Sequence, residues 1–204
     1  MPPNRISLVA PWRTLLKFCY GWLLFTNSFN FQGDNHGDHE SLARNRIMAF
    51  SETADVIKLT DEEAEWLCGV PAKKALEDPS ALRQFFPRTE AILVTGGEKG
   101  AAYDIRGQRG FVPCFSTCTI VETTGAGDAF SAGYIAKCIR LMSKSKEEGA
   151  EAGQGLENVE LDSGGEMARE LVRFGSAVGA LTCCGDGAIL PQPSMLQVLD
   201  LLAI

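Results

Sequence analysis

The sequence predicts an α/β layered fold, in which helices cover a mainly parallel β-sheet. Short apolar runs typical of buried strands alternate with longer segments whose apolar residues recur at helical spacing. At 204 residues the chain is long enough for one sizeable domain with its own core. A content of 45% hydrophobic and 22% charged residues is ordinary for a globular protein.

Helix and strand patterns alternate in the first regular part of the chain. The expected elements, in order, are a helix over 41–54, a strand over 55–59, a helix over 60–69 and a short helix over 78–86. Thr60 and Glu63 have the spacing of a capping box at the start of the second helix, and Gly69 has the position of a stop. That helix is therefore predicted with both of its ends.

Strands dominate the middle of the sequence and helices its end. The run AILVT at 91–95 is apolar throughout, which is typical of a strand buried on both faces. The elements expected after it are strands over 101–105, 111–115 and 118–123, helices over 128–142 and 166–184, and a final C-terminal helix. Residues 143–165 are polar and glycine-rich, so we expect a mobile insertion there.

Charge and hydropathy limit the classes of partner. A net charge of −7 argues against a nucleic-acid groove, which needs a basic face. No uninterrupted apolar run reaches the roughly 18 residues of a membrane span. Residues 1–40 lack clean periodicity, and only basic charges precede the first acidic residue, Asp34. We expect a divergent or artefactual N-terminal segment and a cytoplasmic protein, or a plastid or mitochondrial one if the basic start is a transit peptide.

The segment TTGAGDAF, residues 123–130, places two glycines and an aspartate before a helical run. Gly125 and Gly127 allow backbone conformations that other residues rarely adopt. The amides of Ala126, Gly127 and Asp128 can then converge on one anion at the helix N-terminus, where the macrodipole also favours negative charge. A carboxylate there suits a base that accepts a proton from an attacking hydroxyl, although Asp128 could equally stabilise its own helix.

The chain has neither a P-loop motif nor a complete GxGxxG motif, and its longer pattern resembles a different group of proteins. ETTGAGDAFSAG, at 122–133, is similar to the C-terminal signature of the ribokinase/PfkB family of carbohydrate kinases. Further segments similar to the family occur at 54–69, 92–101 and 174–198, in the same order as in the family. The resemblance covers residues 41–204 apart from the polar insertion, and the wording is nearest to fructokinase-like members.

The resemblance implies an ATP-dependent sugar kinase with a ribokinase-like fold. It implies Asp128 as the base for the sugar hydroxyl, held in the glycine-rich turn of Gly125, Ala126 and Gly127. The residues implied to contact the nucleotide are Thr95, Gly97, Gly100, Thr124, Ser176 and Gly179. The region from 41 to 204 would therefore carry the nucleotide-binding and catalytic part of such an enzyme.

The resemblance also implies metal ions. Glu63 would act on Mg²⁺ through water, in a segment where Thr60 stands in place of the family's usual asparagine. Glu122 replaces the usual aspartate before the two threonines and marks a candidate site for a monovalent cation such as K⁺. The implied cofactors are ATP and Mg²⁺, with K⁺ as a further candidate.

The family's N-terminal half, which supplies the sugar-binding residues and a small β lid, has no visible counterpart in this sequence. Three functions therefore stay open. The first is sugar phosphorylation, and the second is a catalytically silent nucleotide-binding or scaffold protein derived from a truncated kinase. The third is a nucleoside kinase of the same family. The expected partner is a small-molecule sugar, without nucleic acid or membrane, and a homodimer is left open.

Overall fold

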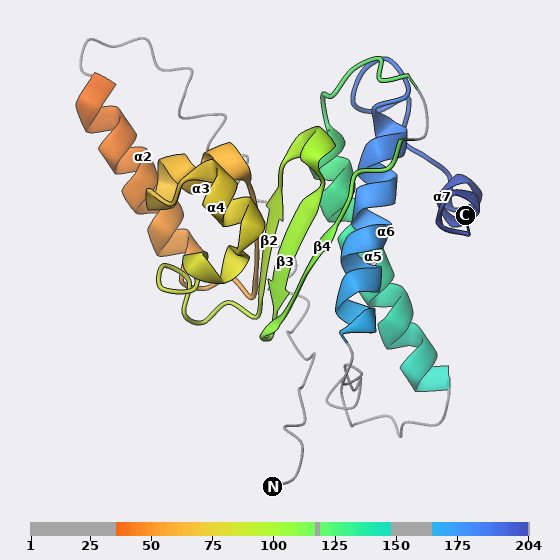
Figure 1. The fold of residues 1–204 in the computed structure, drawn as a ribbon, viewed down its shortest axis with the longest axis horizontal. Coiled ribbons are helices and arrows are strands. Elements are labelled where there is room, and N and C mark those ends of the chain that lie inside the picture. Colours follow the sequence, from red (N-terminus) through yellow and green to blue (C-terminus); the bar gives the residue numbers. More distant parts are fainter. Residues whose placement is uncertain (1–35, 117–118, 148–164, 204) are drawn as a thin grey trace, which may run out of the picture.

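The computed structural model describes residues 36–116, 119–147 and 165–203. Its helices and strands, with η for a short 3-10 helix, are α2 (His36–Ser51), β1 (Val56–Thr60), α3 (Asp61–Cys68), α4 (Ala72–Glu77), η1 (Pro79–Leu82), β2 (Ala91–Thr95), η2 (Gly97–Lys99), β3 (Ala101–Ile105), β4 (Gln108–Val112), α5 (Ala126–Glu147), α6 (Glu166–Thr182) and α7 (Met195–Leu202). Figure 1 shows α3 and α4 on one side of the sheet and α5 and α6 on the other. The predicted α/β layering is confirmed.

The four strands form one sheet in the order β1-β2-β3-β4. β1 and β2 run parallel, whereas β2 with β3 and β3 with β4 are antiparallel. The sequence predicted a mainly parallel sheet, and the described sheet is mixed. The two antiparallel pairs follow from the short connections at 96–100 and 106–107, because a parallel pair needs a crossover of about a dozen residues or more. Only the connection from β1 to β2, through α3 and α4, is that long.

Each face of the sheet has its own core, because successive side chains of a strand point to opposite faces. The core against α3, α4 and η1 includes Ile57, Ala64, Leu67, Leu76, Leu82, Phe86, Ile92, Val94 and Ala102. The core against α5 and α6 includes Ala91, Leu93, Tyr103, Ile105, Val112, Phe130, Tyr134, Leu171 and Val172. The sheet therefore fixes the helices of both layers relative to one another.

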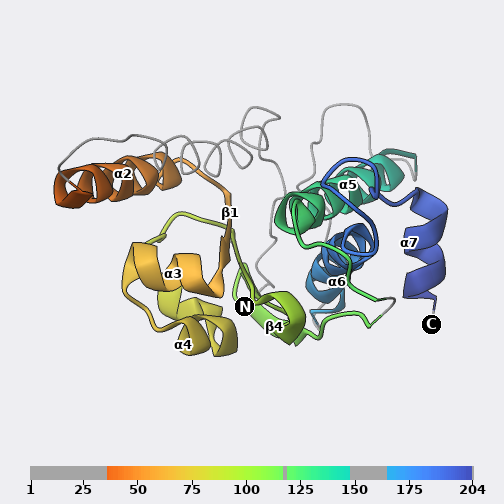
Figure 2. The same cartoon turned by 90° about the horizontal axis from the view of Figure 1, so that it is seen from above.

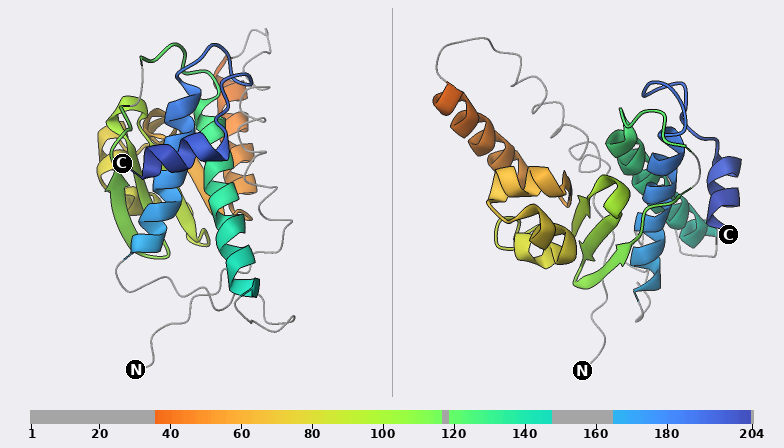
Figure 3. Two further views of the ribbon diagram at one scale, coloured as in Figure 1. Left: turned by 90° about the vertical axis from the view of Figure 1, so that its right-hand side faces the viewer. Right: turned by 45° about the horizontal axis from the view of Figure 1, so that its top comes forward.

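Helices α5 and α6 pack closely because glycines lie at their contact. A Cβ on Gly175 would lie 2.8 Å from the carbonyl oxygen of Phe130, and one on Gly133 would lie 2.7 Å from the Val178 side chain. Neither position accepts a larger residue without a shift of one helix. On the outer side, α7 crosses α6 (Figure 3, left) and buries Val198 against it.

Helix α2 lies beside α3 and α4, on the far side of the sheet from α5, α6 and α7 (Figure 2). The Trp66 indole donates a hydrogen bond of 2.7 Å to Glu40, and the Arg44 guanidinium lies 5.2 Å from the centre of the Trp66 ring. The helix predicted over 41–54 is thus present but begins earlier. The predicted segment boundary near residue 40 falls inside α2, and residues 1–35 lie outside the described part of the chain.

Several predicted elements are confirmed, including the strands over 91–95 and 101–105 and both ends of α3. The strand predicted over 118–123 is wrong for residues 119–123, which have no regular structure. Ile120 and Val121 suggested a strand by their side chains, but both are exposed, and an apolar run without a neighbouring strand cannot pair. The backbone of this segment instead bonds to the end of α6, through the Val121 amide and the Cys183 carbonyl at 2.9 Å.

Three smaller differences concern element type and position. The helix predicted over 78–86 is the single 3-10 turn η1, and α4 was not predicted. The strand predicted over 111–115 begins earlier, at Gln108, and ends at Val112 before a proline, which has no amide to donate. Of the predicted insertion, 143–147 continue α5 and 148–164 lie outside the described residues. No helix in the described ranges is long and apolar enough to cross a membrane.

Candidate active site

The predicted site residues gather at the end of the sheet where the parallel strands β1 and β2 finish. Thr60 and Thr95 are the last residues of these strands and pair with each other across the sheet. The loop that leads into α5 and the turn between β2 and β3 lie at the same end of the molecule (Figure 1). Ligands of α/β proteins usually bind beyond the carboxyl ends of parallel strands.

The N-terminus of α5 has no side-chain cap, because Gly125 precedes its first residue. Gly125 has a φ of +78°, and a Cβ there would lie 2.7 Å from the Cβ of Ala188. The Ala126 amide donates to the Thr123 carbonyl at 3.2 Å. Among the described residues, no acceptor is found for the amides of Gly127 and Asp128. The helix therefore presents two unpaired donors and the positive end of its dipole.

The Asp128 side chain is exposed in the first turn of α5. Its carboxylate is close enough to the Lys58 ammonium to interact with it electrostatically. A side chain that caps its own helix accepts a hydrogen bond from one of the helix amides. The Asp128 carboxylate makes no such hydrogen bond in the described structure. The arrangement leaves the carboxylate accessible to a substrate.

Lys58 is a candidate site residue that sequence analysis missed. It lies two residues after Val56 on β1 and therefore on the α5 side of the sheet, where Val56 packs against the core that includes Phe130. A Cβ on Gly127 would lie 3.0 Å from the Lys58 Nζ, so the ammonium lies directly beside the start of α5. Burial lowers the pKa of Lys58, and the charges of Glu63 and Asp128 oppose that shift. A lysine inside a short apolar strand was the available signal.

Glu63 lies in the first turn of α3 and closes the predicted capping box. Its carboxylate accepts from the Thr60 amide at 2.7 Å, while the Thr60 hydroxyl accepts from the Glu63 amide at 3.0 Å. The box holds the glutamate in a fixed place at the end of β1. Glu63 is also one of the two carboxylates that act on Lys58, which connects the start of α3 with the start of α5.

Glu122 lies in the loop before α5 and ties that loop to the connection between α6 and α7. Its carboxylate accepts a hydrogen bond from the Thr124 hydroxyl and another, of 2.8 Å, from the Gly187 amide. These two hydrogen bonds lower the pKa of the Glu122 carboxyl. Both oxygens are thus engaged by donors of the protein, and the Thr124 hydroxyl is directed at Glu122.

The residues predicted to contact the nucleotide fall into two groups. Thr95, Gly97 and Gly100 lie at the turn between β2 and β3. The Thr95 hydroxyl donates to the Leu59 carbonyl at 3.4 Å, which links the ends of the two parallel strands. Gly100 has a φ of +110°, and a Cβ there would lie 2.5 Å from the Val112 carbonyl oxygen. Glycine is required there by the turn itself.

The second group lies on α6, beside the start of α5. A Cβ on Gly179 would lie 3.0 Å from the Ala126 carbonyl oxygen, so this glycine lets α6 approach the glycine-rich turn. The Ser176 hydroxyl is buried and has no hydrogen-bond partner within the described residues. A buried hydroxyl without a partner is unfavourable, and a bound group that supplies one would relieve the cost.

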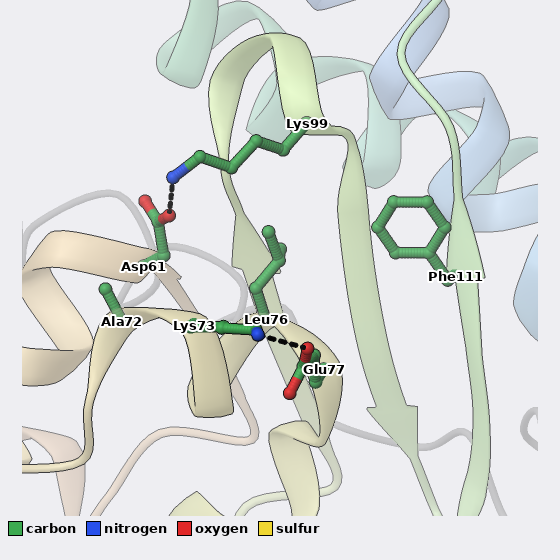
Figure 4. A pocket seen from close by; sticks show the side chains of 7 residues that line it. All are labelled: Asp61, Ala72, Lys73, Leu76, Glu77, Lys99 and Phe111. Carbon is green, nitrogen blue, oxygen red and sulfur yellow. Dashed lines mark hydrogen bonds and ion pairs between the residues drawn. The ribbon is translucent and has the colours of Figure 1, made fainter.

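An open hollow of about 750 Å³ lies on the α4 side of the sheet, opposite to α5 and α6 (Figure 4). Its lining residues are Asp61, Ala72, Lys73, Leu76, Glu77, Lys99 and Phe111. The Lys99 ammonium is bound to the Asp61 carboxylate at 2.8 Å. The hollow contains none of the predicted site residues. Nor do the described residues contain a group of three or more metal-binding side chains.

Comparison with known proteins gives consistent relatives. The family described as "pfkB family carbohydrate kinase" matches residues 27–195. "Probable fructokinase-2" of Arabidopsis thaliana is 33% identical over 162 residues, which are 79% of this chain and 43% of that protein. The chain therefore spans less than half the length of that relative.

Two solved structures share the fold. The fructokinase of Xylella fastidiosa with bound ATP has a TM-score of 0.62 and 24% identity, over 85% of this chain and 50% of that one. The fructokinase of Vibrio cholerae O395 with fructose, ADP and a calcium ion has a TM-score of 0.59 and 23% identity, over 79% and 45%. Since the family match covers most of the chain, this protein belongs to the pfkB family of carbohydrate kinases.

Proposed function

We propose that this chain carries the catalytic and nucleotide-binding part of an ATP-dependent sugar kinase. The observation that supports this most is the start of α5, where two unpaired amides and an accessible Asp128 lie beside the Lys58 ammonium. Unpaired amide donors and a cation, together with one carboxylate, suit phosphoryl transfer, which depends on positioning and charge stabilisation.

In the proposed reaction Asp128 accepts the proton of a sugar hydroxyl as the hydroxyl oxygen attacks the γ-phosphorus of ATP. A new bond forms between that oxygen and phosphorus, and the bond to the bridging oxygen of ADP breaks. The amides of Gly127 and Asp128 hold the oxygens of the transferring group. Gly125 keeps this end of the helix uncapped, because it has no side chain.

The nucleotide would occupy the space between the β2–β3 turn and the start of α5. On this proposal Thr95, Gly97 and Gly100 line one side, and Thr124, Ser176 and Gly179 line the other. The unpartnered Ser176 hydroxyl supports this placement, because a nucleotide would supply the missing hydrogen bond. The fructokinase of Xylella fastidiosa was solved with ATP, which is consistent with the same nucleotide here.

A magnesium ion fits this site only as a partner of the phosphates. Mg²⁺ keeps several waters and needs one or two protein carboxylates besides phosphate oxygens. Glu63 is held in place by its capping box and would bind that ion through water. Mg²⁺ would supply charge neutralisation for the phosphates. K⁺ fits Glu122 less well, because both carboxylate oxygens already accept hydrogen bonds from Thr124 and Gly187.

The proposed substrate is fructose or a related sugar, as the names of the relatives suggest. The test is ADP production by the purified chain with Mg·ATP and a panel of fructose, ribose, other hexoses and adenosine. Asp128→Asn should lower kcat by at least ~10²-fold with little change in ATP affinity. Asp200→Asn, at an exposed position on α7, is the matched control and should leave kcat unchanged.

Sugar-dependent ADP production that Asp128→Asn abolishes would support the proposal. Turnover with adenosine alone would instead identify a nucleoside kinase. A folded chain that binds ATP but transfers no phosphate would contradict the proposal and indicate a nucleotide-binding protein without catalysis.

A further inference from the structure

The Lys58 ammonium is a cation without a fixed partner at the start of α5. No hydrogen bond or ion pair of its Nζ is found within the residues that the structure describes. It is partly buried, and the position of a Cβ on Gly127 is 3.0 Å away. A charge withdrawn from water without a bonded partner is unfavourable for folding. Such an arrangement points to a partner that arrives with the substrate.

The charges around Lys58 indicate the kind of partner. Glu63 and Asp128 are both negative, and both act on Lys58 at long range. On their own, two carboxylates would repel a phosphate from the two free amides of α5. An ammonium that interacts with both carboxylates offsets that repulsion, and lysine is a common point-charge partner of phosphate.

We infer that Lys58 is a catalytic residue that contacts the γ-phosphoryl group during its transfer. This inference rests on the proposed kinase function. Asp128 would hold the attacking hydroxyl, so the phosphorus that this hydroxyl attacks would lie next to Asp128. The Lys58 ammonium lies beside Gly127, the neighbour of Asp128, and interacts electrostatically with the Asp128 carboxylate. The α- and β-phosphates extend away from the attacking oxygen.

Lys58 keeps its proton throughout the transfer and forms no covalent bond. The proton of the sugar hydroxyl goes to Asp128, and the negative charge of the transferring group stays on its three outer oxygens. The ammonium stabilises those oxygens while the phosphorus changes its bond from ADP to the sugar. Its contribution is therefore charge stabilisation in the transition state.

A purely structural role gives a different expectation. If Lys58 only neutralised Glu63 and Asp128, its removal would affect all nucleotides alike. If Lys58 contacts the γ-phosphoryl group, its removal weakens the affinity for a triphosphate and leaves the affinity for a diphosphate almost unchanged. The ratio of the two affinities distinguishes these roles and does not require turnover.

The experiment measures the affinities of ADP and of the β,γ-methylene analogue of ATP by calorimetry, with Mg²⁺, on the whole 204-residue chain. Lys58→Met removes the charge and keeps a similar length. This substitution should weaken binding of the analogue by about 10-fold or more and binding of ADP by less than about 2-fold. A tenfold change in affinity corresponds to one charged contact of ~1.4 kcal/mol. Lys73→Met, on the exposed face of α4, is the control and should change neither affinity.

A second measurement uses the unaltered chain and so does not depend on how a variant folds. Acylation of the Lys58 amine is followed by mass spectrometry with ADP or with the analogue bound. Protection by the analogue beyond that by ADP supports the inference.

Equal losses for both nucleotides in Lys58→Met, or equal protection by both in the unaltered chain, would overturn the inference and leave the kinase function standing. Absence of any nucleotide binding by the unaltered chain would overturn the proposed function and the inference with it. Sugar turnover adds a further check, because Lys58→Met should lower kcat and leave KM for the sugar nearly unchanged.

Discussion

The N-termini of α3 and α5 lie at the same end of the sheet, but one is capped by side chains and the other is not. At α3, Thr60 and Glu63 bond reciprocally and close the first turn. At α5, Gly125 offers no side chain, and two amides have no acceptor in the described structure. One helix N-terminus is thus satisfied within the protein, and the other keeps two unpaired donors, as the proposed ligand site requires.

The difference supports the proposal that the start of α5 serves binding, whereas the start of α3 serves stability. A capping box contributes on the order of 1 kcal/mol to folding, and a helix start without one forgoes that contribution. Proteins keep such unfavourable features mainly where function needs them. The Lys58 ammonium is a second unfavourable feature at the same place, which makes the start of α5 the better candidate for chemistry.

The largest expected effect comes from a methyl group at the open helix start. Gly125→Ala forces an alanine to a φ of +78° and places its Cβ 2.7 Å from Ala188. Left-handed backbone and overpacking together should lower the free energy of unfolding by roughly 2–5 kcal/mol. Urea unfolding monitored by circular dichroism measures this.

Gly187→Ala is the matched control for that change. Gly187 has the same φ of +78°, but a Cβ there has no neighbour within 4 Å. Its cost should be the backbone strain alone, about 1–2 kcal/mol. Equal costs for the two variants would show that the contact with Ala188 does not hold the turn.

The second effect tests the closed helix start. Thr60→Ala removes the hydroxyl that accepts from the Glu63 amide and should lower the free energy of unfolding by about 1 kcal/mol. The Thr60 backbone amide still donates to Glu63, so the affinity ratio of ADP and the ATP analogue should not change. Thr60→Ser, which keeps the hydroxyl, should restore most of the stability. A changed affinity ratio in Thr60→Ala would mean that this cap also positions the ligand.

Sequence reasoning succeeded where one local signal determined the structure. The α3 capping box, Gly69 and the strand at 91–95 depend on neighbours in the chain, and all were predicted. Sequence reasoning failed where the bonding partners of a segment lie far away in the sequence. The segment 119–123 looked like a strand until its bonds to the end of α6 were known.

The candidate site shows the same limit. Asp128 and its glycines were found from a motif, but Lys58 enters the site only because β1 lies beside α5 in space. The loop contact made by Glu122 depends on Gly187, which is 65 residues away in the sequence. A residue whose role depends on such distant neighbours is visible in the sequence only as an anomaly, in this case a lysine within an apolar strand.

A smaller effect separates stability from binding at the open start. Gly127 lies in the first turn of α5, and a Cβ there meets only the end of the Lys58 side chain, at 3.0 Å. Gly127→Ala should therefore raise the free energy of unfolding slightly, by roughly 0.5 kcal/mol, because alanine favours the helix. It should also displace the ammonium and weaken the ATP analogue relative to ADP. Thermal unfolding and calorimetry on the same sample measure both, and an unchanged affinity ratio would argue against a fixed place for Lys58.

The smallest effect concerns the stability cost of Lys58 itself. Burial lowers the pKa of Lys58 below its ordinary value of 10.5, so the folded protein holds this proton less tightly than the unfolded chain. At pH values below that lowered pKa both states are protonated, and the folded state bears the whole cost of the buried charge. Lys58→Met should therefore raise Tm at pH 7 even though it weakens binding of the ATP analogue.

The pH dependence gives the sign of this effect independently. Between the lowered pKa and 10.5 the folded protein releases the proton first, so the stability of the unaltered chain rises with pH across that window. The difference in Tm between Lys58→Met and the unaltered chain should accordingly shrink as pH rises from 7 toward 10.5. Other groups that titrate in this range are present in both proteins and cancel in the difference. A Tm difference that is absent at pH 7, or that widens with pH, would mean that the buried ammonium does not destabilise the fold. The contrast between the two helix starts would then depend on the missing cap alone.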